Sequence, residues 1–91
     1  FLMTRPFLRP DGCRLIVNAK VRGQLIAQIH TDNNKIINGF SFSDCDPVTA
    51  SGFHQELTWN GKSLGDVPEE EIRILFRLSH SELFTFDIPV P

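Results

Sequence analysis

Apolar and polar side chains alternate along most of the chain with a period of two residues, not the 3.6 residues of a helix. In residues 13–21 the apolar side chains occupy every second position: Cys13, Leu15, Val17, Ala19 and Val21. The alternation resumes in residues 24–31, and the intervening pair Arg22-Gly23 has the composition of a turn. Together the two segments predict a β-hairpin whose turn lies at Arg22-Gly23.

Three later segments, residues 53–59, 71–78 and 83–88, alternate in the same way. A short strand is predicted over residues 35–37, after the turn sequence Asp32-Asn33-Asn34-Lys35. Asn and Asp favour turns because their side chains bond to the nearby backbone. Within residues 66–71 the order Asp-Val-Pro-Glu fits a capped helix start, which predicts a short helical turn.

Short strands separated by frequent turn signals predict an all-β fold, an antiparallel β-sandwich with at most one short helical turn. The alternation also predicts which aromatic rings lie inside. Rings in phase with core positions are expected to be buried: Phe53, Trp59, Phe76, Phe84 and Phe86.

The composition is that of one globular domain spanning residues 1–91. A hydrophobic fraction of 41% argues against disorder, and a net charge of −2 supplies no basic surface, so no nucleic-acid partner is expected. No apolar stretch approaches the roughly 18 residues that span a membrane, so no membrane partner is expected either. No targeting signal fixes the localisation. Because the chain begins with Phe1 and ends at Pro91, we interpret it as a fragment of a larger protein.

Reactive side chains gather in residues 39–59. Asp44 and Asp46 flank Cys45, and an Asp-x-Asp pair can offer two oxygens to calcium. The glycine and distal glutamate of an EF-hand are missing, however. Asp44 is better interpreted as a turn cap, and Asp46 as the turn opener before Pro47. We therefore expect no metal and no cofactor, with calcium at Asp44 and Asp46 as the alternative.

Catalysis by this chain is not expected. Cys45 could be combined with His54 or His30, but the acidic residues beside it would raise the pKa of the thiol. Cys13 and Cys45 are expected to be buried free thiols rather than a disulfide. Glu56 could be paired with Asp44 as in a glycosidase, yet its position in an alternating strand predicts a solvent-facing side chain.

Sugar binding is the remaining candidate chemistry. Because Trp59 is in phase with the core, it is expected to be structural rather than a stacking platform for a sugar ring. Sugar contacts would then come from polar side chains in loops. The candidates are Asn33, Asn34, Asp44 and Asn60.

The second half of the chain resembles a known segment. An ordered set of short motifs carries the resemblance: Gly39-Phe40-Ser41, Asp44-Cys45-Asp46-Pro47, Trp59-Asn60-Gly61, Ile72-Arg73-Ile74-Leu75-Phe76 and Leu83-Phe84-Thr85-Phe86. The set is similar to the C-terminal β-sandwich of bacterial proteins related to glycoside hydrolase family 32. Residues 67–71 depart from the Gly-Lys-Pro turn that is more common there.

The resemblance implies a concanavalin A-like sandwich that is accessory to a catalytic five-bladed propeller. The propeller holds the catalytic carboxylates, and none of its motifs occurs in this chain. The expected function is structural support of a carbohydrate-active protein, with weak contact to an oligosaccharide. Cys45 would plug the core and Pro47 would fix the exit of the turn. The alternatives are a calcium-stabilised carbohydrate-binding module and a protein-interaction domain that forms homo-oligomers.

Overall fold

Two long antiparallel strands form the centre of the fold. The computed structural model describes residues 1–90, and these form one six-stranded sheet in the order β1-β6-β3-β5-β4, with β2 also paired to β6. The strands are β1 (Leu2–Met3), β2 (Phe7–Leu8), β3 (Leu15–Thr31), β4 (Cys45–Asp46), β5 (Gly52–Trp59) and β6 (Glu71–Asp87). All pairings are antiparallel, which confirms the predicted all-β antiparallel class.

The predicted hairpin at Arg22-Gly23 is wrong, because the chain does not turn back there. Residues 15–31 form one strand, β3, that bends at this point and pairs with β6 along nearly its whole length. A Cβ on Gly23 would lie 2.3 Å from the Ser79 carbonyl oxygen, so glycine permits the close approach of the two bent strands. Opposite the bend, His80 has a φ of 49°. The two separate strands expected in residues 71–88 are therefore also one strand.

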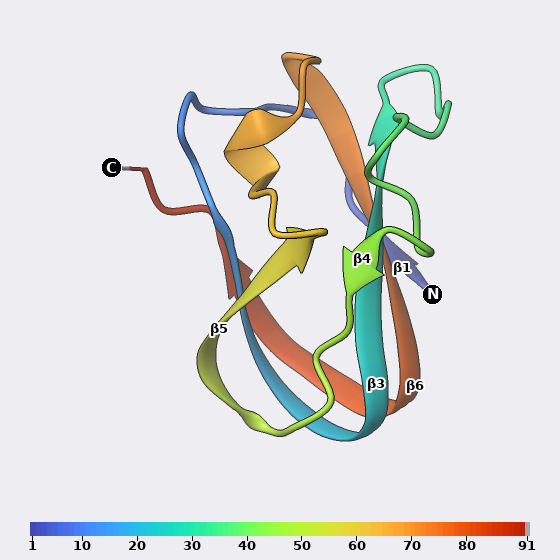
Figure 1. The fold of residues 1–91 in the computed structure, drawn as a ribbon, viewed down its shortest axis with the longest axis vertical. Coiled ribbons are helices and arrows are strands. Elements are labelled where there is room, and N and C mark those ends of the chain that lie inside the picture. Colours follow the sequence, from blue (N-terminus) through green and yellow to red (C-terminus); the bar gives the residue numbers. More distant parts are fainter. Residues whose placement is uncertain (91) are drawn as a thin grey trace.

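The bend folds the sheet over itself and creates two layers (Figure 1). The first half of β3 pairs with β5 and the last part of β6, whereas its second half pairs with the first part of β6. Between the layers lies one core that includes Leu15, Leu25, Leu57, Trp59, Ile74 and Phe76, all with 0% exposure. The burial of Trp59 and Phe76 confirms the prediction from the alternation.

Residues 36–48 cover the free edge of the second half of β3. Leu25 and Val48 exchange backbone hydrogen bonds, and Ile29 accepts from Ile37 and donates to Phe40. The strand expected over residues 35–37 is reduced to a single bridge at Ile36. This covering segment, as we call residues 36–48, explains why Gln28 and His30 are buried although the alternation placed them on a polar face.

The short helical turn lies earlier than predicted. It is a 3₁₀ helix, η1, over Leu64–Asp66, and not within residues 66–71. The backbone N–H of Ser63 donates to the Asp66 carboxylate at 2.9 Å, so the acid caps the start from inside the turn. Leu64 is fully buried and closes one end of the core.

Two bulges on either side of β3 break the alternation. On β5 the pairing moves from Val17–Gln55 to Ala19–Gly52, and on β6 it moves from Asn18–Thr85 to Ala19–Leu83. An extra residue in one strand reverses the direction of the side chains beyond it. The predicted burial of Phe53 and Phe84 is wrong for this reason: they are 78% and 59% exposed.

Candidate functional site

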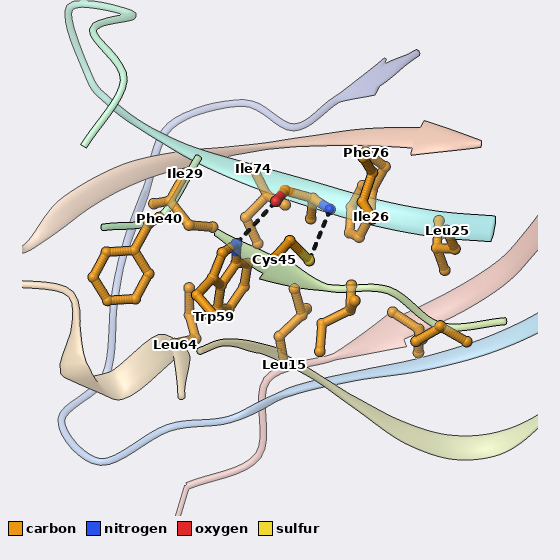
Figure 2. Close-up of a cluster of buried hydrophobic side chains, with 14 of the residues drawn as sticks. Leu15, Leu25, Ile26, Ile29, Phe40, Cys45, Trp59, Leu64, Ile74 and Phe76 are labelled. Atoms are coloured by element: carbon orange, nitrogen blue, oxygen red, sulfur yellow. Dashed lines mark hydrogen bonds between the residues drawn. The ribbon is translucent and has the colours of Figure 1, made fainter. Parts of the chain in front are cut away.

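Residues 39–59, which hold the reactive side chains, contribute two buried side chains that bond to Ala27 of β3. The Cys45 thiol accepts the Ala27 N–H, with Sγ 3.5 Å from the nitrogen. The Trp59 indole donates from Nε1 to the Ala27 carbonyl oxygen at 2.9 Å. Figure 2 shows both bonds among the surrounding core side chains. Cys45 and Trp59 are buried, and their side chains pair the Ala27 N–H and carbonyl. Leaving these two buried backbone groups without a partner would be costly.

This environment makes Cys45 a poor nucleophile. Burial raises the pKa of the Cys45 thiol to about 11, against the weaker opposing effect of the hydrogen bond from Ala27. Burial also raises the pKa of the Cys13 thiol. Both cysteines are free and buried, as expected. His30 is bonded to Gln28 and Asn34, so it is not the base of a Cys45 pair.

The two acidic side chains beside Cys45 act in different turns. The Asp44 carboxylate accepts from the hydroxyl and the backbone N–H of Ser41, which lowers the pKa of Asp44. The Asp46 carboxylate accepts from the Thr58 hydroxyl and the Gly61 N–H, which lowers the pKa of Asp46. Within residues 1–90, no group of three or more His, Cys, Asp or Glu is placed to hold a metal ion.

The polar loop residues considered for sugar contact lie in separate turns. Asn33 and Asn34 belong to the turn that follows β3, where Asn34 has a φ of 66° and accepts a hydrogen bond from His30. Asp44 lies in the covering segment. Asn60, with a φ of 52°, lies in the turn after β5. Each of the last three therefore has a local structural task, and none of the four lines the two hollows described below.

A different surface gathers three exposed side chains, and we call it the double-bulge face: Phe53, His54 and Phe84, around Asn18. The Asn18 amide joins the two bulges, because its Oδ1 accepts the His54 N–H at 2.9 Å and its Nδ2 donates to the Thr85 hydroxyl at 2.7 Å. His54 has a φ of 58°, which is unusual for a residue other than glycine. Bulges and such backbone conformations cluster at functional sites.

Two shallow hollows border this face. The first has a volume of about 300 Å³ and is nearly all apolar, with Ala19, Lys20, Ser51, Gly52, Phe53 and Phe84 around it. The second has a volume of about 560 Å³ and is lined by Arg14, Ile16, His54, Asp87, Ile88 and Pro89. The one ion pair within residues 1–90 joins Arg9 and Asp11. Arg14 and Asp87 form no ion pair within residues 1–90, and both line the second hollow.

This surface combines exposed apolar rings with hydrogen-bonding side chains. Exposed rings next to apolar hollows mark surfaces that contact a ligand or a partner. Arg14, His54 and Asp87 can donate and accept hydrogen bonds at the rim. One sequence signal could have pointed here, namely Asn18 between Val17 and Ala19, because Asn is depleted inside strands.

The fold and this surface define the class of the molecule: a small antiparallel β-protein with a bulged, aromatic outer face. Comparison of the chain with protein-family models, with curated proteins and with solved structures found no match. In the part of the chain that the structure describes, no helix has the length and apolar character to cross a membrane.

Proposed function

We propose that the chain is a non-catalytic accessory domain of a carbohydrate-active protein and that its double-bulge face contacts an oligosaccharide. One observation carries the proposal. Phe53 and Phe84 stand out from neighbouring strands at 78% and 59% exposure, next to a rim of hydrogen-bonding side chains. The resemblance of residues 39–86 to the sandwich of propeller glycosidases supplies the class of parent protein and its catalytic propeller as the partner.

The chemistry of sugars fits the two parts of the face. The C–H face of a pyranose ring is apolar and stacks on aromatic rings, which the two phenylalanines offer. Its hydroxyl groups need donors and acceptors, which Arg14, His54 and Asp87 offer on the adjoining hollow. Because both hollows are shallow and open, we expect weak binding of an extended glycan rather than enclosure of a single sugar.

An array of neutral and acidic oligosaccharides tests this proposal. The native chain should retain at least one glycan. The double variant Phe53→Ser/Phe84→Ser should bind at least about tenfold more weakly, a loss of ~1.4 kcal/mol. A matched control is Asn33→Ala/Asn60→Gly, which removes two exposed polar side chains away from the double-bulge face, keeps a residue that tolerates the positive φ at position 60, and should bind like the native chain.

Two results would contradict the proposal. One is the absence of any retained glycan at millimolar concentration. The other is a glycan whose binding is lost in the Asn33→Ala/Asn60→Gly control and kept in the phenylalanine variant. Far-ultraviolet circular dichroism of each variant separates lost binding from lost fold.

The second candidate function is protein interaction through the edge formed by β1 and β2. Leu2 and Leu8 lie on these short outer strands and are 49% and 71% exposed, and Phe1 beside them is 81% exposed. Exposed apolar side chains on a sheet edge favour pairing with another chain. Size-exclusion chromatography at two concentrations tests this candidate. A mass that stays monomeric and is unchanged in Leu2→Ser/Leu8→Ser counts against it.

A further inference from the structure

His30 is a buried histidine whose two ring nitrogens are both engaged. Its Nδ1 lies 2.8 Å from Asn34 Oδ1, and its Nε2 lies 2.9 Å from Gln28 Nε2. An amide oxygen only accepts and an amide NH₂ only donates. The imidazole must therefore carry its proton on Nδ1 and accept at Nε2, which is the neutral form.

The orientation of the Gln28 amide is fixed by a third residue. Gln28 Oε1 accepts the backbone N–H of Phe42 at 3.1 Å, so the NH₂ group has to face His30. Phe42 belongs to the covering segment, residues 36–48, which closes the outer edge of β3. The Gln28 amide thus connects the protonation state of His30 to the attachment of this segment.

If His30 takes up a second proton, its Nε2–H and the Gln28 NH₂ are both donors and cannot bond to each other. If Gln28 keeps its orientation, His30 Nε2–H points at the amide NH₂. If the amide rotates by half a turn, its oxygen accepts from His30, and the NH₂ then faces the Phe42 N–H. In both arrangements one buried donor loses its acceptor, which is costly. When the amide is rotated, the donor that loses its acceptor is the Phe42 N–H of the covering segment.

The charged residues nearest to His30 in the pairing are two arginines. Arg73 is the cross-strand partner of His30 on β6, and Arg5 runs beside Arg73 on the next chain segment. Asp32 and Lys35 lie in the turn after β3, and Asp44 in the covering segment is bonded to Ser41. Within residues 1–90 no carboxylate forms an ion pair with His30.

We propose that His30 and Gln28 form an acid-sensitive latch, in which protonation of His30 rotates the Gln28 amide and releases the Phe42 N–H, while the other bonds of the covering segment to β3 stay in place. The proposal is independent of sugar binding, because it concerns the opposite end of β3 from the double-bulge face. It assigns a regulatory task to a polar pair that the alternation placed on an exposed face.

Amide hydrogen exchange of the native chain, normalised for intrinsic rates, tests the latch at pH 7.5 and pH 5. Protection of the Phe42 amide should fall on acidification by about tenfold more than that of Phe76, the size expected for one net hydrogen bond. The variant His80→Asn removes an exposed histidine and keeps a residue that tolerates a positive φ. It should behave like the native chain.

Gln28→Glu is the decisive variant. A carboxylate can accept from both a charged His30 and the Phe42 N–H, so the Phe42 amide should stay protected at pH 5. If the Gln28→Glu variant does not fold, the ¹⁵N chemical shifts of the His30 ring in the native chain report the protonation of its two nitrogens. Both nitrogens protonated while Phe42 remains protected, or equal acid release in Gln28→Glu, would overturn the proposal.

Discussion

At the scale of single residues, the chain completes its backbone hydrogen bonds with side chains where a strand is missing. Ala27 has a β6 neighbour on one side only, and on the other side Cys45 and Trp59 bond its N–H and its carbonyl. A thiol and an indole thus take the place of a strand. This explains why two residues that look reactive in the sequence are buried in the core.

Trp59→Phe should destabilise the protein by about 2–3 kcal/mol, because it leaves the buried Ala27 carbonyl unpaired and the smaller ring leaves a void. Urea denaturation followed by circular dichroism measures the change. Phe84→Leu is the control at an exposed ring and should cost less than about 0.5 kcal/mol. Equal losses in the two variants would argue against the hydrogen bond at Ala27.

The Cys45 thiol makes stability depend on pH on the alkaline side. Burial holds the folded pKa at about 11, above the ordinary value of 9.0, so the protonated thiol stabilises the fold. This contribution is complete below pH 9 and is lost as the pH rises toward 11. Urea denaturation at several alkaline pH values should therefore show a fall in stability that is smaller in Cys45→Ala. An identical pH dependence in both proteins would contradict this cause.

At the scale of elements, the main features are a shared bend and two bulges. Gly23 lets β3 and β6 bend together, because any Cβ there would meet the Ser79 carbonyl oxygen. Asn18 joins the bulges of β5 and β6 across β3. These irregularities give a short chain two layers and an aromatic outer face.

Gly23→Ala should destabilise the protein by about 1–3 kcal/mol, since a rigid backbone carbonyl must move to make room. Gly52→Ala is the matched control: its added Cβ would meet the flexible Gln55 side chain at 3.1 Å. Thermal unfolding compares the two. A larger loss in Gly52→Ala than in Gly23→Ala would contradict the shared bend.

His54→Val should cost about 1–2 kcal/mol, because a β-branched residue is strained at a positive φ. His54→Asn, which keeps a residue type that tolerates a positive φ, should be nearly neutral. Chemical denaturation of both variants measures the difference. Equal stabilities would show that the β5 bulge does not have the conformation described above.

The strands themselves follow from the sequence, whereas their irregularities do not. Alternation is a local property, so it identified the strands around Val17, Leu57 and Ile74. The sequence Arg22-Gly23 is compatible with either a bend or a turn. Only the close approach of Gly23 to Ser79 in the folded chain distinguishes the two. A bulge reverses the phase through pairing with another strand, which explains the wrong predictions for Phe53 and Phe84 and why the candidate site was missed.

At the scale of the whole molecule, the folded sheet separates two tasks. One end of β3 carries the double-bulge face, and the other end is closed by the covering segment and the His30–Gln28 pair. The proposed glycan contact and the proposed acid response can therefore be altered independently. A variant of Phe53 should leave the exchange of the Phe42 amide unchanged, and Gln28→Glu should leave glycan binding unchanged.

The central claim is that the two bulges turn Phe53 and Phe84 out to solvent and so create a binding face. Solvent paramagnetic relaxation by a soluble gadolinium chelate, measured on the phenylalanine ring protons, tests it most directly. We predict strong relaxation of the Phe53 and Phe84 rings and little relaxation of the buried Phe40 and Phe76 rings. Protection of Phe53 and Phe84 at the level of Phe76 would contradict the account.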